Sequence, residues 1–577
     1  MDATTTSTPL VSEPGAGRHR AGRPLSLDPA WAHSIDLDLV RRGSGQRYIT
    51  EDWLPLRRLA DGTLLIASTE RFNDAALADA LSEEFDEPVV FTRVGPWELK
   101  SIALKVFGDK VADDAANALF LRNPELSGRI VFSRSQKISG LVFGIALVVL
   151  ALLWPRQTAI GVLATVSLVF LAGTAFKFFV SLQGARFDVV ERITDTEVAE
   201  LSDDDLPVYT VLVPVFHEAN IVAQLIDNLG GLDYPVHKLE VLILIEEEDL
   251  ETRQAIEKAE PPAHFHIVTV PKGHPQTKPR ACNVGLFLAS GSYLVIYDAE
   301  DTPDPDQLKK ALIAFDRGGD DTVCVQAALN YFNATENALT RMFTLEYSYW
   351  FDYMLAGLDR SNLPIPLGGT SNHFRTEALI ELGGWDPYNV TEDADLGIRA
   401  STIGYRVGVI NSTTMEEANT SIPNFIRQRS RWIKGYMQTT LVHARRPVAL
   451  IREVGIVRFL AFALLIGGTP ATFLGVIPFY LLTAASLAIP STVISSVFPV
   501  WVLWICLFNF LIGNGIMVYL SMMGPFKRGT FNLILWSLLN PVYWILHSLA
   551  AYKGLWQLLT RPHYWEKTEH GLTQQTS

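Results

Sequence analysis

Tyr293-Leu294-Val295-Ile296-Tyr297 is an apolar run that leads directly into Asp298-Ala299-Glu300-Asp301, where three of the four residues are acidic. A short apolar run that ends in turn-forming residues predicts a buried strand. Comparable runs alternate with helical patterns throughout residues 186–443. The alternation predicts an α/β domain with a largely parallel sheet, whose ligand would bind beyond the carboxyl ends of the strands. The expected strands are Tyr209–Pro214, Leu239–Ile245, His266–Val270, Tyr293–Asp298 and Thr322–Ala327, with helices at Asn220–Leu229 and Asp304–Phe315.

Apolar stretches long enough to cross a membrane flank this domain on both sides. Residues 138–181 predict a hairpin of two such helices, residues 457–488 a single helix kinked at Pro470, and residues 493–522 a fourth span. Basic residues gather at the ends nearest the domain, so the positive-inside tendency places the domain in the cytoplasm. A fifth stretch, residues 531–551, contains Asn540, Pro541 and His547. Charge favours an interfacial helix there, and a fifth span is the alternative.

The remaining parts of the chain of 577 residues are shorter. Residues 1–45 predict a disordered tail without a signal peptide, because they are rich in small and polar residues. Residues 46–130 predict a small separate α/β module, with strands at Leu64–Ala67 and Pro88–Phe91 and helices at Asp74–Phe85 and Pro96–Phe107. A net charge of −14 argues against nucleic-acid binding. Three scattered cysteines predict neither disulfides nor a zinc site.

Two acidic motifs could carry chemistry. Asp298 and Glu300 follow a predicted strand, and their carboxylates suit a divalent cation that bridges the phosphates of a nucleotide-sugar. A solvated acidic turn is the alternative. Asp393, in Thr391-Glu392-Asp393, could act as the general base that removes a proton from an acceptor hydroxyl. The capping of a helix that begins nearby would also explain this motif.

A basic motif, Gln428-Arg429-Ser430-Arg431-Trp432, precedes the third apolar stretch. Its two guanidinium groups suit a diphosphate, and the indole of Trp432 suits a sugar ring. An amphipathic helix at the membrane surface is a second interpretation, and both can hold together. Gly368-Gly369-Thr370-Ser371-Asn372 would let the backbone approach a ligand closely, although a plain loop has the same composition.

Taken together, these motifs resemble those of processive family 2 glycosyltransferases, the group that contains bacterial cellulose, hyaluronan and chitin synthases. The resemblance runs from Tyr209 to Trp432 and continues through the membrane region. It rests on Pro214 to Glu218, Lys278 to Asn283, Asp298-Ala299-Glu300, Thr391-Glu392-Asp393 and Gln428 to Trp432. It implies a Rossmann-like GT-A domain inserted between transmembrane helices, inversion at the anomeric carbon, and secretion of the product through the enzyme's own channel.

The resemblance also implies roles for individual residues. Asp393 would be the base, and Asp298 with Glu300 would hold Mg²⁺ or Mn²⁺. The sequence departs from the family at Glu300, where Asp is usual, and at Glu246-Glu247-Glu248, where Asp-Asp-Gly is usual. Either Glu246 or Glu247 could face the uridine ring of the donor, with a slight preference for Glu247. The nucleotide-sugar would contact Pro214, Phe216, Glu218, Glu246, Glu247, Lys278, Asn283, Asp298, Arg429 and Arg431. The acceptor would contact Gly369, Thr370, Ser371, Glu392, Gln428 and Trp432, and a gating-like tail within residues 552–577 would use Trp565, Lys567 and Thr568.

The sequence therefore predicts a multi-pass protein of a bacterial inner membrane that polymerises a UDP-sugar into an exopolysaccharide. Its partners would be the donor, the growing polysaccharide, membrane lipid and a periplasmic or outer-membrane export protein, with no nucleic acid. Two alternatives stay open: transfer of a single sugar to a polyprenyl phosphate, and an inactive receptor or export subunit. The N-terminal module resembles the N-terminal domain of type II secretion ATPases, which implies cyclic di-GMP as a regulator; a structural or docking role is the alternative.

Overall fold

A computed structural model describes residues 35–187 and 192–566 of the chain, which forms two compact units, Met1–Gly108 and Asp109–Ser577. The first unit contains a three-stranded sheet of β1 (Leu54–Arg58), β2 (Leu64–Ser68) and β3 (Val89–Arg93). Strands β2 and β3 pair in parallel across helix α3 (Ala75–Phe85), whereas β1, which the sequence analysis missed, pairs antiparallel with β2. Helix α4 (Pro96–Arg122) continues beyond the predicted Phe107, and the unit boundary divides it.

The start of this unit differs from the predicted tail of residues 1–45. Helix α1 (Leu37–Val40) lies within that range and is followed by α2 (Gly45–Glu51). The Asp36 side chain accepts hydrogen bonds from the first backbone N–H groups of α1, and Leu39 and Val40 are buried. A capped turn that buries two apolar side chains is ordered by its contacts, whatever its composition. Residues 1–34 lie outside the described part of the chain.

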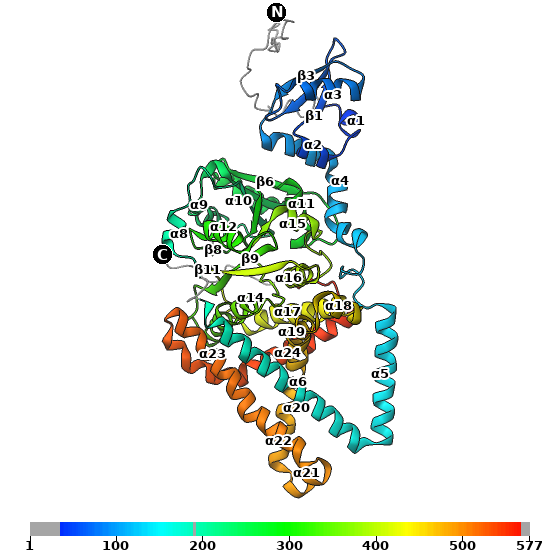
Figure 1. Cartoon of the computed structure of the whole chain (residues 1–577), viewed down its shortest axis with the longest axis vertical. Coiled ribbons are helices and arrows are strands. Elements are labelled where there is room, and N and C mark those ends of the chain that lie inside the picture. The colour runs from blue at the N-terminus through cyan, green and yellow to red at the C-terminus, as the bar shows by residue number, and fades with distance from the viewer. Residues whose placement is uncertain (1–34, 188–191, 567–577) are drawn as a thin grey trace, which may run out of the picture. The chain divides into compact units, whose positions relative to one another are not determined.

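The second unit is built on an eight-stranded sheet in the order β6-β5-β4-β7-β10-β9-β11-β8. Strands β6, β8, β9 and β11 of this sheet are labelled in Figure 1. Strands β4 (Tyr209–Val215), β5 (Leu239–Glu246), β6 (Phe265–Val270) and β7 (Tyr293–Ile296) are parallel neighbours. Strand β10 (Asn372–Arg375) is antiparallel to both β7 and β9 (Thr322–Tyr331). Strand β11 (Arg406–Glu416) is parallel to β9, and the short β8 (Thr302–Pro303) pairs antiparallel with β11. This mixed, mostly parallel GT-A-like sheet confirms the predicted fold class.

Helices surround this sheet, and some of them carry the polar motifs. They are α9 (Val222–Gly230), α10 (Leu250–Lys258), α11 (Lys278–Leu288), α12 (Gln307–Gly318), α16 (Glu392–Thr402) and α17 (Ile422–His443). Helix α13 (Ala338–Tyr349) continues through a π-helical turn, η3 (Trp350–Leu355), into α14 (Ala356–Arg360). The sheet interior is aliphatic, with Val211, Val213, Val241, Ile243 and Val295 fully buried. A packed sheet of this kind fixes the positions of the loops at its carboxyl edge.

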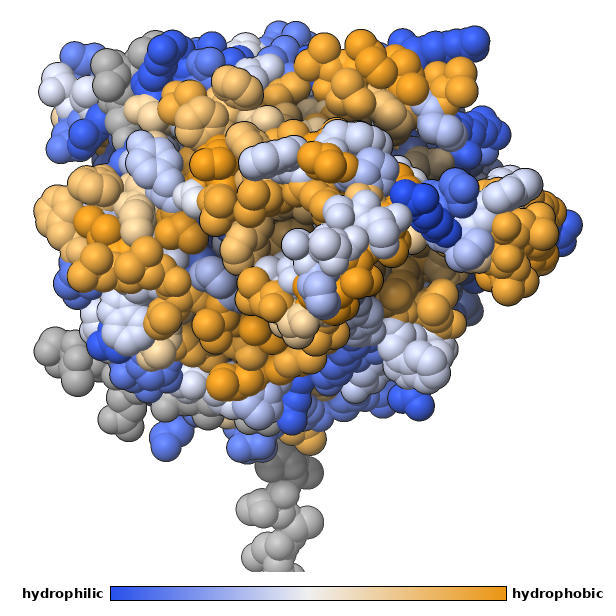
Figure 2. All heavy atoms as spheres, turned by 90° about the horizontal axis from the view of Figure 1, so that it is seen from below, coloured by the Kyte–Doolittle hydropathy of each residue, from blue (hydrophilic) through white to orange (hydrophobic). Residues whose placement is uncertain are grey.

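Five helical stretches in the described part of the chain are long and apolar enough to span a membrane, which identifies a multi-pass membrane protein by length and composition. Their apolar side chains gather on the face seen in Figure 2 (orange). The stretches are α5 (Arg134–Leu153), α6 (Pro155–Gly184), Ile456–Ala488, Val500–Arg528 and Phe531–Thr560. The last meets the criteria for a fifth span, and its placement in or across the membrane stays a prediction.

Proline residues explain the irregularities of these stretches. Ile456–Ala488 is continuous through α19 (Ile456–Phe462), a π-helical turn η4 (Ala463–Gly467) and α20 (Gly468–Ala488), with Pro470 just after that turn. The predicted fourth span, residues 493–522, is interrupted, because α21 (Ser491–Val497) ends before Phe498-Pro499 and α22 (Val500–Phe508) begins after it. The extended backbone of Phe498 is the conformation that a following proline favours. Turn η5 (Asn509–Gly513) then leads into α23 (Asn514–Arg528), and η6 (Phe531–Leu539) precedes α24 (Asn540–Thr560).

Candidate active site

A cavity of about 570 Å³ opens at the carboxyl ends of strands β4, β5 and β7. Its position is the one that the strand pattern predicts for a ligand. Most of the predicted site residues line it: Pro214, Phe216, Glu218, Glu246, Lys278, Asp298, Glu300, Gly369, Thr370, Glu392, Asp393, Gln428, Arg429, Arg431, Trp432 and Trp565. The structure therefore brings together side chains that lie up to about 350 residues apart in the sequence.

Three predicted residues do not line the cavity. Glu247 is exposed to solvent, so Glu246 is the glutamate that reaches the site. Asn283 donates to the carbonyl oxygens of Ala115 at 2.8 Å and Trp385 at 2.9 Å, and thus joins neighbouring segments. The Ser371 hydroxyl is buried and donates to Thr414 Oγ1 at 2.7 Å, within the sheet. Lys567 and Thr568 lie outside the described residues.

Glu246 reaches the cavity already engaged by a cation. Its two carboxylate oxygens accept hydrogen bonds from Arg280 Nη2 at 2.7 and 2.8 Å, and Arg280 is fully buried. Burial raises the pKa of Glu246, and the Arg280 charge opposes that rise. Lys278 and Arg280 are both on α11, yet the sequence analysis singled out Lys278 only. Arg280 thus compensates a carboxylate at the edge of the cavity.

Asp298 forms an ion pair with Lys278 Nζ, which also donates to the carbonyl oxygen of Gly369 at 2.7 Å. Burial opposes the charge of Lys278, but the carboxylates of Asp298 and Glu392 outweigh it and raise its pKa. The backbone N–H of Asp298 donates to Asp301 Oδ2 at 2.7 Å, and the same carboxyl group contacts the Thr370 hydroxyl. Asp301 therefore holds the loop that carries Asp298, and the contact with the Thr370 hydroxyl holds the Asp301 side chain in place.

Asp298 and Glu300 are suited to a divalent ion completed by a ligand. The described residues contain no group of three or more His, Cys, Asp or Glu side chains that could hold a metal ion by themselves. Mg²⁺ in phosphate-transferring sites needs no such group, because one or two carboxylates and the substrate phosphates complete its coordination. Both carboxylates line the cavity, so they fit that arrangement.

A further carboxyl group, Glu416 at the end of β11, also lines the cavity and was missed by the sequence analysis. Burial raises its pKa well above the usual value, and repulsion from Asp301 and Glu300 adds to the rise. The signal was present in the sequence, because Glu416-Glu417 ends an alternating run that begins near Arg406. Strand β11 was absent from the predicted strands, so its end could not be placed at the site.

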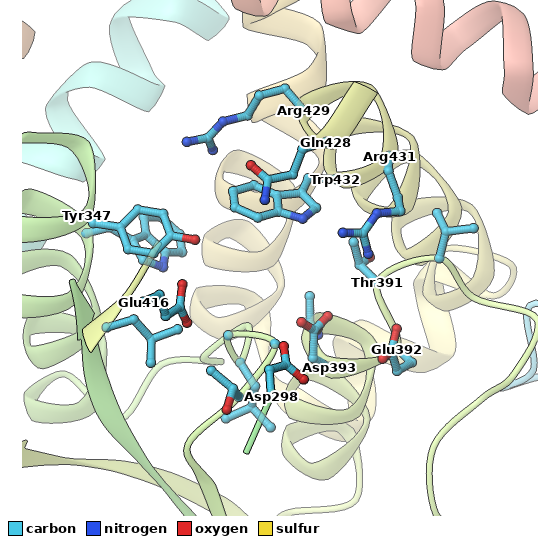
Figure 3. Close-up of a pocket in the computed structure, with 18 of the residues that line it drawn as sticks. Asp298, Tyr347, Thr391, Glu392, Asp393, Glu416, Gln428, Arg429, Arg431 and Trp432 are labelled. Carbon is cyan, nitrogen blue, oxygen red and sulfur yellow. Dashed lines mark hydrogen bonds between the residues drawn. The ribbon is translucent and has the colours of Figure 1, made fainter. Parts of the chain in front are cut away.

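Thr391-Glu392-Asp393 opens helix α16, but the Thr391 side chain makes no capping hydrogen bond. Asp393 Oδ1 accepts from the Ala394 N–H at 2.7 Å, and burial raises the pKa of Asp393. Burial and the neighbouring Asp393 raise the pKa of Glu392 to about 8. Figure 3 shows the Asp393 and Asp298 carboxylates pointing into the same part of the cavity. A half-buried carboxylate with a raised pKa in this position is suited to accept a proton from a ligand hydroxyl.

The two arginines of the basic motif have different surroundings. Arg429 Nη2 donates to Glu346 Oε2 at 2.7 Å, and its guanidinium lies 4.3 Å from the Phe343 ring centroid and 4.4 Å from that of Trp432. Arg431 makes no hydrogen bond to any residue that the structure describes, and its guanidinium lies 4.5 Å from the centroid of the Trp565 ring. In Figure 3, Arg429 points away from the carboxylates, whereas Arg431 lies above Glu392. Arg429 is thus engaged by a carboxylate, whereas Arg431 donates to no described residue and faces the part of the cavity where a phosphate could bind.

Close packing holds these motifs in register. A Cβ atom added at Gly435 of α17 would clash with Thr391 Oγ1, so the glycine lets the helix approach the Thr391 turn. Trp432 lies nearly parallel to Phe343, with ring centroids 6.3 Å apart, and Gln428 Oε1 accepts from Asn419 Nδ2 at 2.8 Å. Neither the Gly435 contact nor the Asn419 bond could be read from the sequence.

The end of the described chain packs over the same cavity. Lys434 Nζ donates to the Tyr564 carbonyl oxygen at 2.6 Å, and Glu566 accepts from Lys553 Nζ at 2.8 Å. These contacts hold Trp565 over Arg431. On its other side the cavity continues among the membrane helices, where its lining residues are Lys177, Thr469, Phe473, Met517, Ser521, Asn540, Tyr543, Trp544 and His547.

Comparison with known families identifies relatives of this region. The family model described as Glycosyl transferase family group 2 matches residues 293–552. A probable glycosyltransferase of Bacillus subtilis, YdaM, is 25% identical over 41% of this chain and 57% of its own length. Glucomannan 4-beta-mannosyltransferase 1 of Oryza sativa is 28% identical over 41% of this chain and 47% of its own length. The chain thus spans about half the length of these curated relatives, and the match relates residues 293–552 to family 2 glycosyltransferases.

Solved structures give weaker likenesses. A mannosyltransferase of Pyrobaculum calidifontis, in complex with GDP-mannose and Mn²⁺, has a TM-score of 0.37 and 19% identity, covering 68% of this chain and 99% of that one. The Staphylococcus aureus protein TarS has a TM-score of 0.28 and 14% identity, covering 46% of this chain. Likenesses at this level do not bear on the ligands of this chain.

Proposed function

We propose that this chain is a membrane glycosyltransferase that transfers a hexose from a UDP-sugar to the hydroxyl group of a growing glycan, with inversion. One observation carries the proposal: a single cavity joins Asp298, Asp393, Arg431 and Trp432 and continues among the membrane helices. The match to the family 2 model supports sugar transfer, and the relatives named glucomannan 4-beta-mannosyltransferases support a glycan acceptor.

The donor lies at the carboxyl edge of the sheet, with its diphosphate between Lys278 and Arg431. Lys278 is already fixed beside Asp298, and Arg431 offers unpaired donors, so both cations are in place before the donor arrives. Asp298 and Glu300 would hold Mg²⁺ or Mn²⁺, which would supply positive charge to the departing diphosphate. The sugar ring faces the space between Asp393 and Trp432.

Asp393 acts as the general base. Its carboxylate takes the proton of the acceptor hydroxyl while that oxygen forms a bond to the anomeric carbon. The bond from the anomeric carbon to the diphosphate breaks on the opposite face, and the nucleoside diphosphate leaves with the electron pair. Burial raises the pKa of Asp393, which increases its basicity at the moment of transfer. Trp432 supports the acceptor ring.

The finer proposals concern product and location. We place the protein in a bacterial inner membrane with the catalytic domain in the cytoplasm, where it extends one chain repeatedly and passes it outward, with a periplasmic or outer-membrane protein as receiver. The continuation of the cavity into the membrane helices supports a path for the product. Regulation by cyclic di-GMP through the N-terminal unit rests on the sequence resemblance alone. Adding that nucleotide to the vesicle assay described next tests it, and an unchanged rate would reject it.

Membrane vesicles that contain the full chain test the proposal. They receive labelled UDP-sugars one at a time with Mg²⁺ or Mn²⁺, and the products of the wild type and Asp393→Asn are sized. We expect long chains from the wild type and a loss of about 10²–10⁴-fold in the variant. Products with one sugar on a lipid would reject repeated extension in favour of transfer to a polyprenyl phosphate. Equal polymer from both proteins would reject Asp393 as the base.

A further inference from the structure

Lys177 places an ammonium group inside a membrane helix. It belongs to α6 (Pro155–Gly184), one of the five helices able to span a membrane, and lies seven residues before the end of that helix. Its side chain is half-buried and lines the membrane part of the cavity. Ionisable groups in such helices face cavities or partners, and they are candidates for contact with a ligand. Lys177 has no role in the transfer chemistry described above.

The ammonium group has no partner among the residues that the structure describes. The only acidic side chain lining this part of the cavity is Glu346, on α13. Its Oε2 atom accepts from Arg429 at 2.7 Å and from the Tyr543 hydroxyl at 2.7 Å, with His547 Nε2 3.6 Å away. Lys177 is near enough to interact with the Glu346 charge, which Arg429 already neutralises, and its side chain makes no hydrogen bond or ion pair within residues 35–187 and 192–566.

Apart from α13, the elements that line this part of the cavity contribute no acidic side chain to it. Helix α17 contributes the paired Arg429, and α24 contributes His547, Tyr543, Trp544 and Asn540. Helices α20 and α23 contribute only neutral side chains, which are Thr469, Phe473, Met517 and Ser521. This part of the cavity therefore has an uncompensated positive charge, in contrast to the carboxylate-rich donor part.

We propose that Lys177 binds an anionic group, a carboxylate or a phosphate, carried by the acceptor as it leaves Trp432 and enters the membrane part of the cavity. The inference rests on the proposed glycosyltransferase function and narrows its acceptor to a charged one. Aromatic rings of Trp350 and Trp544 line the same part of the cavity and offer flat faces for sugar rings. A charged acceptor would supply the counter-ion that the protein lacks.

Binding measurements on the purified full chain test this directly and need no turnover. Quenching of tryptophan fluorescence reports ligand in the cavity, because Trp432, Trp350 and Trp544 line it. The ligands are a neutral oligosaccharide, the same oligosaccharide ending in a uronic acid, and a short polyprenyl phosphate. The variants are Lys177→Gln, Lys177→Arg and a control, Lys137→Gln, which removes an exposed cation of α5 outside the cavity.

We expect Lys177→Gln to weaken binding of an acidic ligand at least about tenfold and to leave the neutral ligand unchanged. Lys177→Arg and Lys137→Gln should stay within about threefold of the wild type. Selective loss with the uronic acid would identify a sugar carboxylate as the ligand, and selective loss with the polyprenyl phosphate would identify a lipid phosphate. The proposal would be overturned if Lys177→Gln weakened binding of the neutral and acidic ligands equally, or if it weakened binding of neither acidic ligand. Failure of the wild type to transfer any sugar would reject the proposed function instead.

Discussion

Arg429 and Arg431 are two residues apart on α17, and their surroundings predict opposite effects of the same substitution. Arg429→Met removes the partner of Glu346, whose side chain is 30% exposed, toward the cavity. Burial opposes ionisation of Glu346, yet its interactions with Arg429 and His547 lower its pKa from 4.5 to about 2. That difference corresponds to roughly 3 kcal/mol in favour of the ionised form. Because the carboxylate is partly exposed and keeps Tyr543, we expect Arg429→Met to cost about 2–3 kcal/mol.

In detergent solution this loss should lower the apparent Tm by roughly 2–3 °C, because the unfolding entropy of so large a unit is high. The double variant Glu346→Gln/Arg429→Met should recover most of the loss, since no charge is then left unpaired. Arg431→Met should instead keep a Tm near that of the wild type and lower kcat/KM by about 10²–10³-fold, because its guanidinium stacks on Trp565 but donates no hydrogen bond to any described residue and can bind the diphosphate. A stable Arg429→Met that has lost activity, together with an unstable but active Arg431→Met, would refute this assignment.

Three further changes have defined outcomes. In a pH–rate profile, activity should fall as the pH drops through the pKa of Asp393, which is raised above its ordinary 3.8, because the base must be ionised. The KM for the donor should rise near pH 8, where Glu392 becomes negatively charged. Glu392→Gln should remove the change near pH 8 and keep the change that Asp393 causes. Asp298→Asn should raise the Mg²⁺ or Mn²⁺ concentration for half-maximal rate on the order of tenfold in a metal titration, and unchanged dependence would exclude Asp298 as a ligand. Gly435→Ala should displace Thr391 and lower kcat about tenfold or more, whereas Gly475→Ala, which meets no atom within 4 Å, should not.

The parts of the fold that follow from local pattern could be predicted. Strands β4, β5, β6, β7 and β9 bury aliphatic side chains in short runs, so their hydrophobicity alone indicated them. Strand β10 could not be predicted, because it has four residues and includes His373, whose ring is buried between Tyr209 and Gln307. Only the tertiary hydrogen bonds of that histidine make a polar residue favourable inside the sheet.

The candidate site, like the fold, could be predicted from the sequence only in part. Short motifs carried enough chemistry to indicate Asp298, Asp393, Arg431 and Trp432, all of which line the cavity. The motifs could not separate Arg429 from Arg431, because the difference comes from Glu346, 83 residues earlier in the chain. The resemblance assigned Asn283 and Ser371 to ligand contacts, whereas in the structure their side chains bond to backbone carbonyl groups and to a buried hydroxyl group. Partners distant in sequence decide such assignments.

The raised pKa values at the donor end have one common cause, the crowding of carboxyl groups in a buried space. Asp301, Glu392, Asp393 and Glu416 all have raised pKa values, and Lys278 and Arg431 are the cations nearest to them. A nucleoside diphosphate adds more negative charge to this space, so its binding is unfavourable unless positive charge or protons enter with it. A divalent ion beside Asp298 and Glu300 would meet that need and would also lower the pKa of Asp393. Donor binding and ionisation of the base are then coupled through the same charge, so that a larger fraction of Asp393 is ionised when the donor and the ion are in place.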